Sequence, residues 1–99
     1  MQRLLNFMIA LRRLPPLSEL TGEEERMLFE MRQAWEYQGK LSVSDVYAMA
    51  SGKSPSTAYR LAVALRDKGL VEIRVTEADK RGREITFTSK AEYLFQKLA

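Results

Sequence analysis

Apolar residues recur at helical spacing near the start of the chain, where they form a stripe of Leu4, Leu5, Met8 and Ile9. This spacing predicts a short amphipathic helix. The prolines at positions 15 and 16 must end it, because proline has no backbone N–H to donate inside a helix. The stripe needs a partner, which is either the chain's own core beside the last helix or a second molecule.

A second helix is predicted between an N-cap at Thr21 and a stop at Gly39. Thr21 and Glu24 have the spacing of a capping box, and acidic residues fill the first turn, where the helix dipole favours them. The apolar residues behind them follow the pattern of one buried face and are Met27, Leu28, Met31, Ala34 and Trp35. We therefore expect Trp35 in the core.

Residues 42–68 predict two more helices with a short break between them. Ser42 and Asp45 can cap a short helix, and Ser54, followed by proline at the first helical position, can cap a second one over residues 55–68. The inward residues of the short helix are Val43, Val46, Tyr47 and either Met49 or Ala50. Those of the longer helix are Ala58, Leu61, Ala62 and Leu65. Two helices joined by a short turn that contains glycine are typical of a helix-turn-helix.

The pattern changes after Gly69, where β-prone segments over residues 70–75 and 84–88 predict two paired strands. The polar connection between them, residues 76–83, concentrates Lys80, Arg81 and Arg83 at a hairpin tip, which we call the wing.

Thr88 can cap a last helix over residues 89–98. The residues of this helix that are spaced to cover the core are Ala91, Leu94, Phe95 and Leu98. The predicted fold is therefore mainly α with a small β-hairpin (α+β), a winged helix-turn-helix of about five helices.

Composition narrows the possible chemistry. The 99-residue chain has no His and no Cys, which excludes the usual acid–base group, thiolate nucleophiles and nearly all zinc sites. We therefore expect no enzyme activity, no metal and no cofactor, and a reducing cytoplasm as the compartment. The longest apolar stretch, residues 4–11, is far shorter than the roughly 18–20 residues that a bilayer span requires.

Charge is distributed unevenly along the chain. Residues 21–50 carry three basic and six acidic side chains, whereas residues 51–83 carry eight basic and four acidic ones. A basic third of this kind is a candidate surface for a polyanion, although ordinary solvated surface would give the same count.

The helix predicted over residues 55–68 begins with side chains of the kind that contact bases and phosphates in a DNA major groove. Small polar groups near a helix N-terminus can contact phosphates or base edges, and a basic residue one turn later can reach a base. The residues in these positions are Lys53, Ser54, Ser56, Thr57 and Arg60. Taken singly, each is equally typical of a cap or a solvated surface.

The wing has the composition of a minor-groove contact. Arginine at a hairpin tip can insert where the negative potential of the narrow groove is strongest, and Lys80, Arg81 and Arg83 are placed for it. Asp79 can hold the guanidinium of Arg81 in one orientation.

These motifs together resemble the MarR family of winged helix-turn-helix regulators. The segment SPSTAYRLAVALRDKGLV at residues 54–71 is similar to that family's recognition helix and strand start, and DKRGREITFT at residues 79–88 is similar to its wing, which carries a D-x-R pair. The resemblance covers roughly residues 20–99. It implies that residues 54, 56, 57 and 60 face the major groove, that Arg81 reaches the minor groove, and that Asp79 orients Arg81.

Two features depart from the family pattern. Ala91 stands where the family usually has glycine, and the sequence ends at Ala99 without the long C-terminal helix that builds the family's dimer. We therefore expect two parts, residues 1–16 as a dimerisation element and residues 20–99 as the DNA-binding domain. The expected partners are double-stranded DNA and a second copy that pairs through Leu4, Leu5, Met8 and Ile9. The alternative function is a winged-helix module that contacts protein or RNA.

Overall fold

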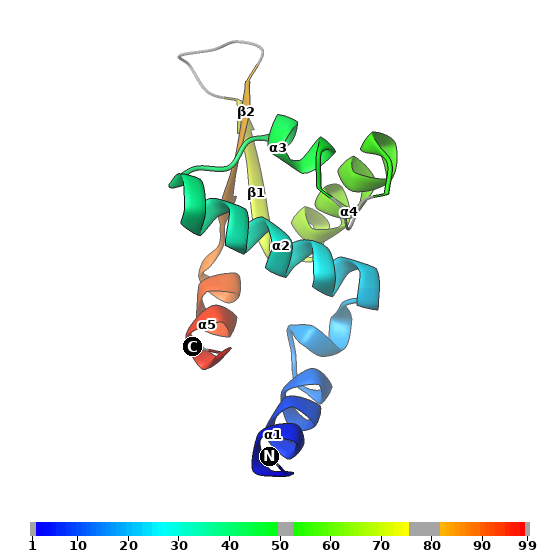
Figure 1. Cartoon of the computed structure of the whole chain (residues 1–99), viewed down its shortest axis with the longest axis vertical. Helices are drawn as coiled ribbons and strands as arrows, with labels where there is room; N and C mark the ends of the chain where they lie inside the picture. The colour runs from blue at the N-terminus through cyan, green and yellow to red at the C-terminus, as the bar shows by residue number, and fades with distance from the viewer. Residues whose placement is uncertain (1, 50–52, 76–81, 99) are drawn as a thin grey trace.

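The computed structural model describes residues 2–49, 53–75 and 82–98, and its element order matches the predicted fold class (Figure 1). The elements are α1 (Gln2–Arg13), a 3-10 helix η1 (Leu17–Glu19), α2 (Gly22–Gln38), α3 (Val43–Tyr47), α4 (Pro55–Asp67), β1 (Val71–Val75), β2 (Arg83–Phe87) and α5 (Ser89–Leu98). The sequence pattern did not predict η1, and α4 ends one residue before the expected boundary.

The helix starts form as their capping residues predict. Thr21 Oγ1 accepts from the backbone N–H of Glu24, and the Glu24 carboxylate accepts from that of Thr21 in return. Ser42 and Asp45 repeat this arrangement at the start of α3. Gly39 ends α2 with a φ of 78°, in the left-handed region where glycine costs least. Local spacing alone thus fixes where α2 and α3 begin.

A core formed by α2, α3, α4, the hairpin and α5 supports the helix-turn-helix. α4 packs against α2 and α3 and also contacts β1. Fully buried side chains at the centre of this core include Met27, Leu28, Met31, Val46, Leu65, Leu70, Ile85 and Leu94. Burial of an apolar side chain of this size contributes about 1.5–3 kcal/mol, so this core holds α2, α3, α4 and α5 together with the hairpin.

The two strands form an antiparallel hairpin, with Val71 opposite Phe87 and Val75 opposite Arg83. Backbone contacts with the segment before α3 extend it, because the Ile85 N–H donates to the Leu41 carbonyl at 2.8 Å and Ser42 forms a bridge with Glu84. β2 is therefore tied directly to the start of the helix-turn-helix.

Some residues expected inside are more exposed than the pattern predicts, and Ala34 and Phe95 are only partly buried. Tyr47 is 44% exposed, because five-residue α3 turns it outward onto the flank of α4. Trp35 is only partly buried, since it packs at the edge of the core with the Arg32 guanidinium over its ring. Leu98 is 38% exposed at the end of α5.

Helix α1 lies at one end of the long axis, away from the core, and the start of β2 lies toward the other end (Figure 1). α1 contacts η1, and its apolar side chains Leu4, Leu5 and Ile9 are 63%, 57% and 45% exposed. The stripe is thus not covered by the chain's own core. Among the described residues, no helix is both long and apolar enough to span a membrane.

Candidate nucleic-acid interface

The first turn of α4 presents small polar groups to solvent. Ser54 caps the helix, because its Oγ accepts from the Thr57 backbone N–H at 3.3 Å, and the same oxygen lies 2.9 Å from Thr57 Oγ1. Ser54 and Ser56 are exposed and Thr57 is partly buried. Lys53, also exposed, precedes the cap with a φ of 64°, a conformation that residues other than glycine rarely adopt.

Arg60 lies on the exposed outer face of α4, one turn after Ser56. The opposite face is buried through Ala58, Leu61, Ala62 and Leu65. The predicted division between an inner stripe and an outer polar face is therefore confirmed.

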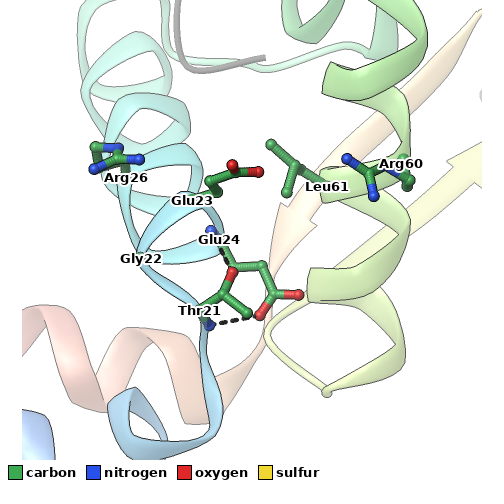
Figure 2. Close-up of a pocket in the computed structure, with 7 residues that line it drawn as sticks. All are labelled: Thr21, Gly22, Glu23, Glu24, Arg26, Arg60 and Leu61. Atoms are coloured by element: carbon green, nitrogen blue, oxygen red, sulfur yellow. Dashed lines mark hydrogen bonds between the residues drawn. The ribbon is translucent and has the colours of Figure 1, made fainter.

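An open hollow of about 470 Å³ separates Arg60 from the start of α2. Its lining is Thr21, Gly22, Glu23, Glu24, Arg26, Arg60 and Leu61. Figure 2 shows Glu23 and Arg60 on opposite sides of the hollow, with Leu61 between them. Glu23 thus places a negative charge across the hollow from the arginine that the sequence predicts to read DNA.

Arg83, which the sequence places at the hairpin tip, is instead the first residue of β2 and lies against α4. Its Nη1 donates to the Tyr59 hydroxyl at 3.0 Å. The other wing residues singled out from the sequence, Asp79, Lys80 and Arg81, lie outside the described residues. The structure therefore joins the base of the wing to α4.

Two tyrosines lie at this junction, of which the sequence pattern did not single out Tyr59 and placed Tyr47 among the inward-facing residues. Tyr59 and Tyr47 stack at a tilt, with ring centroids 6.1 Å apart and an interplanar angle of 39°. The sequence did contain a hint, because Tyr59 is an aromatic residue next to Arg60 that does not belong to the buried stripe of α4.

An ion-pair network holds the other end of α4 against η1 and α2. Lys68 Nζ donates to Glu24 Oε1 and, at 2.8 Å, to the Glu19 carbonyl. Burial by itself would raise the pKa of Glu24, but hydrogen bonds from Lys68 and the Thr21 backbone, together with the Lys68 charge, hold that pKa below its ordinary value of 4.5. Glu24 is therefore a buried carboxylate that stabilises the scaffold beneath the hollow.

The described part of the chain contains no group of three or more acidic side chains able to hold a metal ion. α4 and β2 expose Arg60 and Arg83, and Ser54 and Ser56 lie exposed at the start of α4. These side chains can donate hydrogen bonds to phosphate oxygens.

No protein-family model and no curated protein sequence matches the chain. Solved structures do match. MepR of S. aureus, in complex with DNA, has a TM-score of 0.70 at 19% identity over 98% of this chain and 73% of its own. BpsR of Bordetella bronchiseptica, whose DNA binding is regulated by 6-hydroxynicotinic acid, has a TM-score of 0.61 at 22% identity over 98% and 66%.

A third match is the transcriptional regulator Tm0710 of Thermotoga maritima, with a TM-score of 0.65 at 21% identity over 98% of this chain and 66% of its own. These three proteins are MarR-family regulators. The TM-scores of 0.61 to 0.70 establish the shared fold. The chain therefore has the winged helix-turn-helix fold of MarR-like regulators.

Proposed function

We propose that the chain binds double-stranded DNA sequence-specifically as a small transcriptional regulator. α4 occupies the major groove, and the wing, residues 76–83, occupies the minor groove. The observation that carries the proposal is the two-sided nature of α4, whose first turns expose Ser54, Ser56 and Arg60 while the opposite face is buried.

The proposed contacts divide by chemistry. Ser54, Ser56 and Thr57 bind phosphates or base edges at the helix start, and Arg60 donates two hydrogen bonds to one base. In the wing, Asp79 orients Arg81 into the minor groove. Lys53, Lys80 and Arg83 add positive charge along the same surface.

The test is selection of binding fragments from genomic DNA, followed by affinity measurements on the selected sequence. Arg60→Ala should weaken binding by about 1–3 kcal/mol and relax the preference at one base position. Lys97→Ala, which removes the same charge from an exposed site on α5, is the matched control and should leave affinity unchanged. Unaltered binding by Arg60→Ala contradicts the assignment of α4 to the major groove.

The same measurement separates this function from a protein- or RNA-interaction module. DNA binding by basic side chains weakens steeply with salt, because counterions are released from the duplex. A chain that binds no duplex at any salt concentration would favour the interaction module.

We also propose that two copies pair through α1. A single winged module buries roughly 600–1,000 Å² on DNA, which is usually too little for tight specific binding. A two-fold dimer would read an inverted repeat with half-site centres about 34 Å apart. The exposed side chains of Leu4, Leu5 and Ile9 supply an apolar surface for this contact. Met8 is also expected in this stripe, but its side chain is not among those that the structure describes.

The dimer is tested by the double substitution Leu4→Glu and Leu5→Glu. Sedimentation at micromolar concentration should show a dimer for the unaltered chain and a monomer for the variant, with weaker binding to the selected DNA. The control is Tyr37→Glu, which places charge at a 93% exposed site on α2. A monomeric unaltered chain, or a variant that still dimerises, would exclude α1 as the interface.

A further inference from the structure

Three side chains from three elements meet where the wing joins the helix-turn-helix. Arg83 from β2 donates to the hydroxyl of Tyr59 from α4, and the ring of Tyr59 packs against that of Tyr47 from α3. Arg83 is exposed, Tyr47 is 44% exposed and Tyr59 is partly buried. We call these three residues the junction cluster.

The backbone holds the cluster in place from several sides. The Ile85 N–H donates to Leu41 and Ser42 forms a bridge with Glu84, so β2 is fixed to the segment that starts α3. α3 in turn packs against α4. The backbone positions from which the three side chains extend are thus set by the fold.

Among the residues that the structure describes, the hydrogen-bond partner of Arg83 is the phenol of Tyr59 and not a carboxylate. Two other arginines near it in the sequence are paired with carboxylates, Arg74 with Glu72 and Arg66 with Asp67. The adjacent Glu84 points to the opposite face of the strand, since successive side chains alternate. Within the described residues, no salt bridge neutralises Arg83.

The hydrogen-bonding capacity that remains at the cluster suits a tetrahedral anion. A guanidinium has five N–H donors, of which Tyr59 accepts one. The Tyr59 hydroxyl accepts from Arg83 and so retains its own proton to donate. Two adjacent donors of this kind, one of them charged, match two oxygens of a phosphate group.

We propose that the junction cluster is a binding subsite for one backbone phosphate of the DNA that the chain binds. This proposal rests on the proposed function and assigns Arg83 to the phosphate backbone instead of the minor groove. The hydrogen bond to Tyr59 holds the guanidinium of Arg83 at the flank of α4, a position that favours a phosphate over a base edge. Its contact fixes the register of α4 and the wing on the duplex without reading sequence.

The test measures the affinity of the full chain for the selected duplex and for an unrelated duplex over a range of salt concentrations. Arg83→Gln should weaken binding to both by a similar factor, about three- to tenfold, and should reduce the salt slope by about one. Tyr59→Phe keeps the ring and removes only the hydroxyl, and it should weaken both by about two- to fivefold. The double variant should lose less than the product of the two single losses.

Two control variants make the same substitutions, Arg to Gln and Tyr to Phe, at positions outside the junction cluster. Arg74→Gln removes an arginine already paired with Glu72, and Tyr93→Phe removes a hydroxyl from a 60% exposed tyrosine on α5. Both should bind as the unaltered chain does. Thermal unfolding of every variant shows that the fold is intact.

The remaining outcomes overturn the proposal in distinguishable ways. If Arg60→Ala weakens binding but Tyr59→Phe and Arg83→Gln do not, the subsite is wrong and the proposed function stands. If Arg83→Gln weakens binding to one duplex only, Arg83 contacts a base and the phosphate assignment is wrong. If the unaltered chain binds neither duplex, the proposed function and the subsite fail together.

Discussion

The two ends of β2 hold arginines in opposite ways. At the C-terminal end of β2, the guanidinium of Arg32 from α2 lies over the ring of Phe87. The same guanidinium lies 4.4 Å from the ring centre of Trp35 and 4.6 Å from that of Phe95. Glu92 accepts two hydrogen bonds from this guanidinium, at 2.6 and 3.3 Å, and Glu36 accepts a third. At its start, Arg83 is exposed and touches a neutral hydroxyl.

This contrast separates an arginine that stabilises the fold from one that is available to a partner. The Arg32 side chain is only 18% exposed, its charge is neutralised, and its planar group covers aromatic rings from three elements. Arg83 is exposed, and within residues 2–49, 53–75 and 82–98 no carboxylate or cation–π partner is found for it. Residue type and net charge therefore say little about the role of an arginine, whereas its partners decide it.

The largest predicted difference between Arg32 and Arg83 is in how much each stabilises the folded chain. Arg32→Ala should lower the free energy of unfolding by about 2–3 kcal/mol, because the rings lose their cation and Glu92 loses its partner. For a domain of this size, the melting temperature should fall by about 10–20 °C. Arg83→Ala should change stability by less than about 0.5 kcal/mol. If denaturant melts show that both variants lose the same free energy of unfolding, the proposed difference between the two arginines is wrong.

A second prediction concerns Glu24, the buried carboxylate paired with Lys68. Its pKa in the folded chain lies below the ordinary value of 4.5, so its stabilising contribution is present above that value and is lost as the pH falls through the folded pKa. Glu24→Gln, which keeps the capping hydrogen bonds, should destabilise the chain by about 1–2 kcal/mol at pH 7.

The loss caused by Glu24→Gln should shrink as the pH falls through the lowered pKa of Glu24, because the carboxylate of the unaltered chain then becomes protonated and loses the charge that the variant already lacks. Urea melts at several pH values measure this convergence. Glu72→Gln, at an exposed position on β1, is the control and should show little loss at any pH. A Glu24→Gln loss that does not depend on pH would mean that its charge has no stabilising role.

The smallest effect is expected at the DNA-facing end. Glu23 lies across the hollow from Arg60, so its charge competes with phosphate for that arginine. Glu23→Gln should raise affinity for the selected DNA by about twofold at low salt, and the gain should fade as salt screens the charges. Glu36→Gln makes the same change at the far end of α2 and should have no effect on affinity. A Glu23→Gln variant with unchanged or lower affinity would exclude this competition.

Much of the fold could be predicted because its signals are local. Both capping boxes, the ends of α1 and α2 and the buried stripe of α4 follow from residues within a few positions of each other. Tyr47 and Trp35 are less buried than predicted. Helical spacing shows which way a side chain points, but it does not show whether a neighbouring helix or strand extends far enough to cover that side chain. The proposed contacts of Asp79, Lys80 and Arg81 stay predictions, since they lie outside the described residues.

The sequence by itself determined where the helices and strands of the winged domain lie and which face of α4 is buried, because these depend on backbone hydrogen bonding and on apolar spacing along one element. Only the tertiary structure decided which distant side chains meet. Arg32 reaches Glu92 across 60 residues, and Arg83 reaches Tyr59 across 24. Such pairings depend on how α2, α4, α5 and β2 pack in three dimensions, so spacing along the chain carries no record of them.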